Sequence, residues 1–277
     1  MSIREWMSAH GWSTSADMKT ALIQMDIAWG DVQKNINRAI TLIGEHPGAD
    51  LYILPEMFST GFNGECEKEP AEGLKAMQEI ARERDCAVAG SIAVELEGGA
   101  RVNRFYFVTP DSVRYYDKKH LFTYSGEHKK FTGGTERVIV EWKGLRILLL
   151  VCYDLRFPVW SRNRGDYDMI LYVASWPSSR RFAWDSLLKA RAIENQCFVA
   201  GVNRVGTDPS CVYDGGSVLL DPYGTAIASC TDSMEEVAEG DVDMNVLTEY
   251  REKFPVLDDA ETFVLVARSG RAGIRNF

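Results

Sequence analysis

The sequence lacks a membrane-spanning segment, a secretion signal and an excess of positive charge. It has no run of about 18 apolar residues, the length that a transmembrane helix needs. Its first residues, MSIREWMSAHGWSTSAD, contain no apolar block of about 7–15 residues, which forms the core of a signal peptide. Lys and Arg total 31 against 40 Asp and Glu, a formal net charge of −9. Because proteins that bind nucleic acid or anionic membranes present basic surfaces, the sequence predicts neither kind of partner.

Cysteine and histidine are also scarce, with six and four residues respectively. No two cysteines form a C-x-x-C pair, so the sequence indicates no zinc site of that type, and we expect no metal or organic cofactor. Six cysteines in 277 residues are too few for a disulfide-based fold, which favours reduced thiols and a cytoplasmic protein. The cysteines are Cys66, Cys86, Cys152, Cys197, Cys211 and Cys230.

What the sequence does contain is a regular succession of short apolar runs and amphipathic helical segments, which is typical of an α/β fold. We expect one domain over residues 18–277, since no internal repeat or low-complexity stretch divides the chain. Residues 1–17 precede the first strand pattern and are interpreted as an N-terminal extension, to which we assign no role. The residues from about 251 onward show little periodicity, and we expect this tail to wrap a surface or a partner subunit.

The expected elements alternate along the chain. Asp31 is a predicted N-cap, followed by Ile36 and Ile43 at helical spacing. The polar segment 121–136 is predicted to be a functional loop. The number of expected strands and helices suits two packed sheets with helices outside. Expected strands lie at 20–25, 51–54, 87–94, 101–108, 112–117, 138–142, 145–151, 169–174, 198–203, 216–221, 225–229 and 236–243. Expected helices begin at about 31 and cover about 70–84, 158–165 and 183–195.

Three residues with reactive side chains, Glu56, Lys118 and Cys152, each follow an apolar strand. In α/β folds, ligand sites collect at the carboxyl ends of strands. A cysteine nucleophile needs a base for its proton, and a carboxylate serves when burial raises its pKa. A lysine stabilises the oxyanion that forms when the thiolate attacks a carbonyl. The three residue types therefore suffice for acyl transfer, although their spacing alone does not show that they meet.

Each of the three also has a structural interpretation. A cysteine after a buried strand is often a small buried hydrophobe, and a single Glu or Lys is most often a surface charge. The other five cysteines keep the structural interpretation. A Cys–His pair is the competing arrangement, but no papain-like sequence surrounds Cys152. We interpret His120 as a structural neighbour of Lys118.

Three motifs, in order and widely separated, resemble the nitrilase superfamily of carbon–nitrogen hydrolases, and the resemblance extends over about residues 19–259. Further segments at 125–128, 159–162, 174–177, 190–196 and 250–255 are most similar to the bacterial omega-amidase branch, which acts on acids like 2-oxoglutaramate. The three motifs are Leu54-Pro55-Glu56, Tyr116-Asp117-Lys118-Lys119-His120-Leu121-Phe122 and Cys152-Tyr153-Asp154-Leu155-Arg156-Phe157-Pro158.

The resemblance implies a role for each motif residue. Glu56 would be the general base, Lys118 the oxyanion-stabilising lysine and Cys152 the nucleophile. Lys118 matches the family better than its neighbour, because the family places one variable residue between its lysine and the histidine. Glu127 matches a second glutamate near the family's site and is an auxiliary residue, and the backbone N–H of Tyr153 would also bind the oxyanion. The family further implies a four-layer α-β-β-α sandwich that pairs through helices, hence a homodimer or a higher homo-oligomer.

A substrate with a distal carboxylate needs a cation, preferably an arginine. Arg180 and Arg181 are the candidates, each with the alternative of a solvated charge at a helix start, and Trp176 is a candidate pocket wall. Arg156 is interpreted as a structural ion-pair partner. The implied reaction takes a small amide and water. The motifs leave open an N-carbamoyl compound, a nitrile or another amide as substrate. A more distant alternative is a catalytically silent scaffold subunit.

Overall fold

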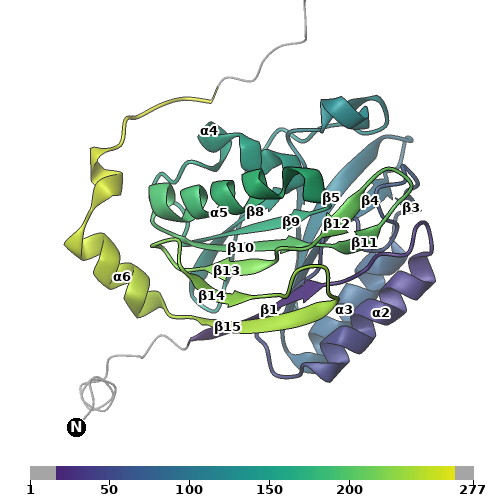
Figure 1. The fold of residues 1–277 in the computed structure, drawn as a ribbon, viewed down its shortest axis with the longest axis horizontal. Coiled ribbons are helices and arrows are strands. Elements are labelled where there is room, and N and C mark those ends of the chain that lie inside the picture. The colour runs from purple at the N-terminus through teal and green to yellow at the C-terminus, as the bar shows by residue number, and fades with distance from the viewer. Residues whose placement is uncertain (1–16, 266–277) are drawn as a thin grey trace, which may run out of the picture.

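A computed structural model describes residues 17–265 of the chain. The prediction of an N-terminal extension over 1–17 and the last part of the predicted tail therefore lie almost wholly outside the described residues. Within them, the chain forms two large β-sheets that pack face to face, with helices on their outer sides (Figure 1). No helix of the described part has the length and apolar content to cross a membrane.

The first sheet is built mainly from the N-terminal half of the chain. Its central strands β1, β2 and β4 run parallel, and β15 returns from the far end of the chain to pair antiparallel with β1. The strands lie in the order β15 (Glu236–Val242), β1 (Met18–Gln24), β2 (Leu51–Ile53), β4 (Ala87–Glu95), β5 (Arg101–Val108) and β6 (Val113–Asp117), and the short β3 (Glu67–Lys68) also pairs with β4.

The second sheet has six strands with a parallel centre of β8, β9 and β10. β8 is apolar on both faces, and the structure buries it between its two neighbours, as such a run predicts. The order is β14 (Ala226–Ser229), β13 (Val218–Leu220), β10 (Phe198–Asn203), β9 (Met169–Ala174), β8 (Leu145–Val151) and β7 (Ile139–Trp142). A separate hairpin joins β11 (Val205–Thr207) to β12 (Val212–Asp214).

Alternating side chains assign the two faces of each sheet to different cores. On β1, Leu22 packs into the core between the sheets, whereas Ile23 packs under the helices α2 (Val32–Glu45) and α3 (Glu72–Arg84). The helix α5 (Arg181–Asn195) covers the second sheet with Trp184 and Leu188. The layers are thus helix, sheet, sheet and helix, which confirms the predicted four-layer sandwich (Figure 1).

The structure departs from the expected elements in four places. The sequence analysis missed β3 and the β11–β12 hairpin, because strands of two or three residues carry too few positions to show a period of two. The helix expected at 158–165 is only α4 (Pro158–Ser161). The loop 121–136 contains two short 3-10 turns, Thr123–Ser125 and Glu127–Lys129. The predicted tail begins inside a helix, α6 (Met244–Lys253), and continues through a 3-10 turn at Val256–Asp259.

Helix α6 lies along one end of the second sheet (Figure 1). Arg251, in its last turn, donates hydrogen bonds to the carboxylate of Asp168 at 2.8 Å and to the carbonyl of Tyr167 at 2.9 Å. Gln196 Nε2 donates to the carbonyl of Phe254 at 2.7 Å. The described part of the predicted tail therefore follows the surface of its own domain.

Candidate active site

The three predicted reactive residues meet in the gap between the two sheets. Glu56 follows β2, Lys118 follows β6, and Cys152 follows β8, so that three carboxyl ends of strands contribute to one place. The three side chains line one cavity of about 290 Å³. Two elements of the first sheet and one of the second therefore form its floor, an arrangement that the separate motifs did not reveal.

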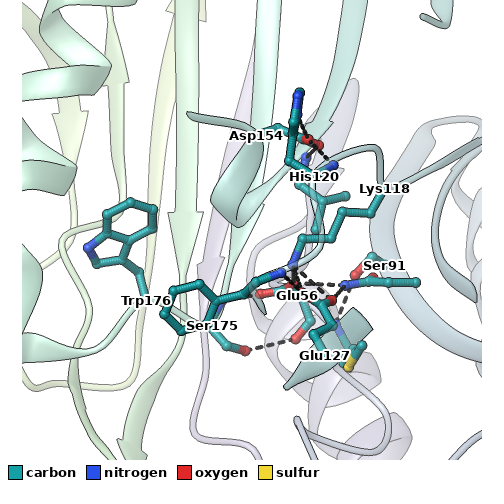
Figure 2. Close-up of polar contacts among 12 residues, drawn as sticks. Glu56, Ser91, Lys118, His120, Glu127, Asp154, Ser175 and Trp176 are labelled. Carbon is teal, nitrogen blue, oxygen red and sulfur yellow. Dashed lines mark hydrogen bonds and ion pairs between the residues drawn. The ribbon is translucent and has the colours of Figure 1, made fainter. Parts of the chain in front are cut away.

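Lys118 lies between two carboxylates. Its Nζ donates to Glu56 Oε1 at 2.8 Å and to both carboxylate oxygens of Glu127 at 3.0 Å (Figure 2). None of the three side chains is more than 1% exposed. The cluster therefore holds two potential negative charges and one positive charge away from water.

The carboxylate of Glu56 is held from three sides. Oε1 accepts hydrogen bonds from Lys118 Nζ and, at 2.7 Å, from Asn103 Nδ2. Oε2 accepts from the backbone N–H of Ser175 at 2.8 Å, and the Ser175 hydroxyl donates to the backbone carbonyl of Glu56 at 3.2 Å. These hydrogen bonds, one of them from a charged donor, fix the orientation of the carboxylate.

Cys152 begins a tight 3-10 turn, Cys152–Arg156, directly after β8. Its φ of 46° lies in the left-handed region, which non-glycine residues seldom adopt and which is concentrated at functional sites. The thiol lines the same cavity as the Glu56 carboxylate. Burial, together with the negative charge of Glu56, raises the pKa of the thiol well above its usual value, although Lys118 opposes the shift. At neutral pH the group is therefore a thiol that needs a base to become a nucleophile.

The other two charged groups of the floor also have shifted pKa values. Burial opposes the charge on Lys118, but the carboxylates of Glu127 and Glu56 outweigh it and raise the pKa of Lys118 well above its ordinary value. Burial raises the pKa of Glu127, with a further rise from the charge of Glu56, while Lys118 acts in the opposite direction. The lysine is thus a permanent cation at the working pH of most enzymes.

A second polar network supports the turn that carries Cys152. The buried carboxylate of Asp154 accepts from the backbone N–H of His120 at 2.9 Å and from the hydroxyl of Tyr116 at 2.8 Å (Figure 2). His120 Nδ1 lies 2.8 Å from Asp154 Oδ1, and its ring stacks on Phe157 with centroids 3.8 Å apart. His120 is therefore a structural neighbour of Lys118, as predicted.

The walls of the cavity are aromatic and cationic. Tyr153, Trp176 and Arg180 line it, together with Arg156 and Lys130. Arg180 lies over the ring of Phe122 with 5.2 Å between its Cζ and the ring centroid. Neither Arg180 nor Lys130 forms an ion pair with any residue that the structure describes, and both cations remain available to a ligand.

The structure places two arginines differently from what the sequence predicted. Arg181 is not among the lining residues; it is bound to Asp185 and Asp232, each at 2.8 Å, and lies 3.5 Å from Asp214. Arg156, predicted as a structural ion-pair partner, pairs with no carboxylate of the described residues. It lies over the ring of Trp176, 4.9 Å from the centroid, at the cavity wall. Arg156 is exposed at the end of the turn that begins at Cys152, and it lines the cavity.

The sequence analysis missed several residues of the site. Asn103 and Ser175 bind Glu56, and the β11–β12 hairpin supplies Asp208, Cys211 and Tyr213 to the cavity wall. Asn103 is a polar residue on the face of β5 that also carries Phe105 and Phe107, a signal that would have been readable. Within the described residues, no group of three or more His, Cys, Asp or Glu side chains is arranged to hold a metal ion.

Comparisons with known proteins agree with this geometry. The profile of the carbon–nitrogen hydrolase family matches residues 19–252. The chain is 45% identical to the omega-amidase YafV of Escherichia coli (strain K12) over 253 residues, which cover 90% of this chain and 98% of the relative. It is 34% identical to the 2-oxoglutaramate amidase of Bacillus subtilis (strain 168), with 86% and 95% covered.

A solved structure is similar over nearly the same residues. This is XC1258 from Xanthomonas campestris, a CN-hydrolase superfamily protein with an arsenic adduct in its active site. Its TM-score with this chain is 0.88 at 40% sequence identity, and the match covers 91% of this chain and all of the other. The likeness therefore includes both sheets and the strand ends at which the cavity lies.

Proposed function

The chain belongs to the carbon–nitrogen hydrolase family, and from this premise we propose that it is an omega-amidase. Its substrates would be small dicarboxylate monoamides such as 2-oxoglutaramate and 2-oxosuccinamate, which it would hydrolyse to the acid and ammonia. The observation that carries this proposal is a cavity with Cys152 beside a buried Glu–Lys–Glu cluster and with arginines free of ion pairs on its wall. The size of about 290 Å³ suits a small ligand.

In the first half-reaction, Glu56 takes the proton of the Cys152 thiol, and the thiolate attacks the carbonyl carbon of the amide. Glu56 Oε1 already accepts from two donors and Oε2 from one, so Oε2 retains the lone pair for this proton. Lys118 and the backbone N–H of Tyr153 would stabilise the oxyanion. Glu56 then gives its proton to the departing ammonia, and a thioester remains on Cys152.

In the second half-reaction, water adds to the thioester. Glu56 accepts a proton from the water, and the resulting hydroxide attacks the thioester carbonyl at the same oxyanion position. The C–S bond breaks, the sulfur recovers its proton through Glu56, and the acid leaves. Glu127 does not exchange a proton in this scheme; it holds Lys118 in place through both of its oxygens.

The carboxylate of the substrate would bind Arg180, with Arg156 as a second cation. Both lie on the cavity wall, and each is already oriented by the aromatic ring beneath it. Trp176 would form an apolar wall for the carbon chain between the carboxylate and the amide. Because Arg181 is bound to three aspartates, we do not assign it to the substrate.

We also propose a cytoplasmic homodimer or higher homo-oligomer. The six cysteines are free thiols, as a reducing compartment favours. Exposed apolar side chains on α4 and α5 support association through these helices: Val159 is 56% exposed and Phe182 is 86% exposed. Sedimentation of the purified full chain tests this, and a monomer at micromolar concentration would contradict it.

The function is tested by ammonia release from a small panel of compounds, with Cys152→Ala as the blank. The panel contains 2-oxoglutaramate, succinamate, glutamine, an N-carbamoyl amino acid and a nitrile. We expect the highest kcat/KM for the two dicarboxylate monoamides. Turnover of the carbamoyl compound or the nitrile alone would contradict the substrate and leave the three reactive residues in their roles. Failure of the whole panel would favour the silent-scaffold alternative.

A further inference from the structure

Asn103 is a neutral side chain that contacts both carboxylates of the cavity floor. It lies on β5, and its side chain belongs to the same alternating row as Phe105 and Phe107, which pack between the sheets. Its Nδ2 donates to Glu56 Oε1 at 2.7 Å and lies 3.4 Å from Glu127 Oε1. The residue is fully buried.

The backbone of the same residue holds Lys118. The carbonyl of Asn103 accepts a hydrogen bond from the backbone N–H of Lys118 at 2.9 Å. One residue thus fixes the strand end that carries the lysine and, through its side chain, the carboxylate that the lysine binds. An apolar side chain of the same shape at position 103 would preserve the backbone hydrogen bond to Lys118 and remove the side-chain hydrogen bond to Glu56.

We propose that Asn103 is a positioning residue that holds Glu56 through its Oε1 oxygen and so turns the Oε2 oxygen toward Cys152. The inference rests on the proposed function only for the role of Glu56 as base. The carboxylates of Glu56 and Glu127 share the single ammonium of Lys118 in a buried site. The amide of Asn103 supplies a further donor without adding another charge.

The orientation follows from counting donors. With Lys118 and Asn103 on Oε1 and only the Ser175 N–H on Oε2, the free lone pair of the base lies on Oε2. Without Asn103, both oxygens would have one donor each, and the carboxylate would no longer distinguish them. The charged or titratable groups that face Glu56 are Lys118, Glu127 and the Cys152 thiol.

The test compares wild type with Asn103→Leu and Asn103→Asp, and it uses Asn163→Leu as a control. Asn163 is another buried asparagine; it binds the backbone carbonyls of Tyr167 and Asn195, and none of these residues lines the cavity. One readout is the pH profile of kcat/KM for ammonia release. The other is the pH dependence of iodoacetamide alkylation at Cys152, measured by mass spectrometry of its peptide. Cys211, which lines the same cavity, reports access of the reagent.

For Asn103→Leu we expect the acidic limb of both profiles to move up by about one pH unit, the effect of losing one hydrogen bond to a charged group. We expect kcat to fall by about tenfold and KM to change by less than about twofold, with unchanged labelling of Cys211. Asn103→Asp should move the limb further, because it adds a third carboxylate. Asn163→Leu should lower only the melting temperature.

A variant that melts earlier but keeps both pH profiles would overturn the proposal, since Asn103 would then only fill space. Asn103→Asp with wild-type profiles would do the same. If Asn103→Leu does not fold, Asn103→Ala carries the same comparison. The alkylation readout needs no substrate, so a failure of the proposed omega-amidase activity and a failure of this inference are seen separately.

Discussion

The ammonium of Lys118 is the single positive charge between two buried carboxylates, so one substitution there changes the charge of the whole cavity floor. With the lysine, the cluster carries one net negative charge when both glutamates are ionised. Without it, two buried carboxylates face each other with no cation between them. The role that we propose for Lys118 in binding the oxyanion therefore cannot be separated from its pairing with Glu56 and Glu127.

Replacing Lys118 with methionine is expected to lower kcat by about a hundredfold or more, because an oxyanion donor is lost. It should also destabilise the fold by about 3–5 kcal/mol, the usual effect of breaking a buried ion pair. The control is Lys119→Met, which removes the adjacent cation that lies near Trp160. Ammonia release and thermal unfolding are the measurements. A change in KM alone would remove Lys118 from the oxyanion site.

Arg180→Met is expected to raise KM for 2-oxoglutaramate at least about tenfold, because a charge-assisted hydrogen bond to the carboxylate is lost. KM for a neutral amide such as butyramide should change much less. The matched variant Arg181→Met removes the neighbouring side chain, which is bound to aspartates instead of lining the cavity. Equal effects of Arg180→Met on both amides would show that the carboxylate binds elsewhere.

At the scale of elements, the segment 133–134 crosses directly over the end of β6. The backbone N–H of Gly134 donates to the carbonyl of Lys118 at 2.9 Å. A Cβ atom on Gly134 would lie 2.1 Å from the carbonyl oxygen of Asp117, far inside contact distance. The close approach of two backbones therefore requires glycine here, and it sets the position from which Lys118 extends into the cavity.

Gly134→Ala should consequently destabilise the protein by about 1–3 kcal/mol, as overpacking does, and lower kcat at the same time. Gly44→Ala is the control, because a Cβ there meets only Arg84 at 3.6 Å, an ordinary contact. Within helix α2 that change should stabilise by about 0.5–1 kcal/mol and leave kcat unchanged. Denaturant unfolding and ammonia release measure both. An active Gly134→Ala of wild-type stability would disprove the steric argument.

At the scale of the whole molecule, Asp168 connects the C-terminal helix to the second sheet. Its carboxylate accepts hydrogen bonds from Arg146, at the start of β8, and from Arg251, in α6. Burial pushes the pKa of Asp168 upward, but the hydrogen bonds from these arginines outweigh it and lower the pKa below its ordinary value. The ionised form is thus the one that the folded state prefers.

A carboxyl group whose pKa is lower in the folded state than in the unfolded state stabilises the fold at pH values above its unfolded pKa. This stabilisation is lost as the pH falls through the folded-state pKa. Asp168→Asn should therefore destabilise the protein by about 1–3 kcal/mol at pH 7. The difference from wild type should shrink below about pH 4, where Asp168 of the unfolded chain takes up a proton before the native carboxylate does. The control is Asp111→Asn in an exposed turn. A difference that stays constant down to pH 3 would contradict this linkage.

Much of the site was predictable because its candidate residues lie in short sequence motifs. Glu56, Lys118 and Cys152 each follow an apolar strand, and strand ends in an α/β fold collect at one edge. The apolar runs likewise determined the two sheets and most helices. The short strands and α6 were missed, because two or three residues show no period and α6 is stabilised by Arg251 and Gln196 contacts distant in sequence.

The sequence alone predicted Glu56, Lys118 and Cys152 as the reactive residues and determined the strands that carry them, and its family resemblance implied the four-layer fold. Only the tertiary structure decided which arginine faces the cavity, since Arg180 and Arg181 are adjacent and differ in the aspartates that surround them. It also decided that Asn103 touches Glu56, 47 positions away in the chain. Hydrophobic periodicity fixes which face of a strand is buried, whereas the partner of a buried polar group depends on how two whole sheets pack.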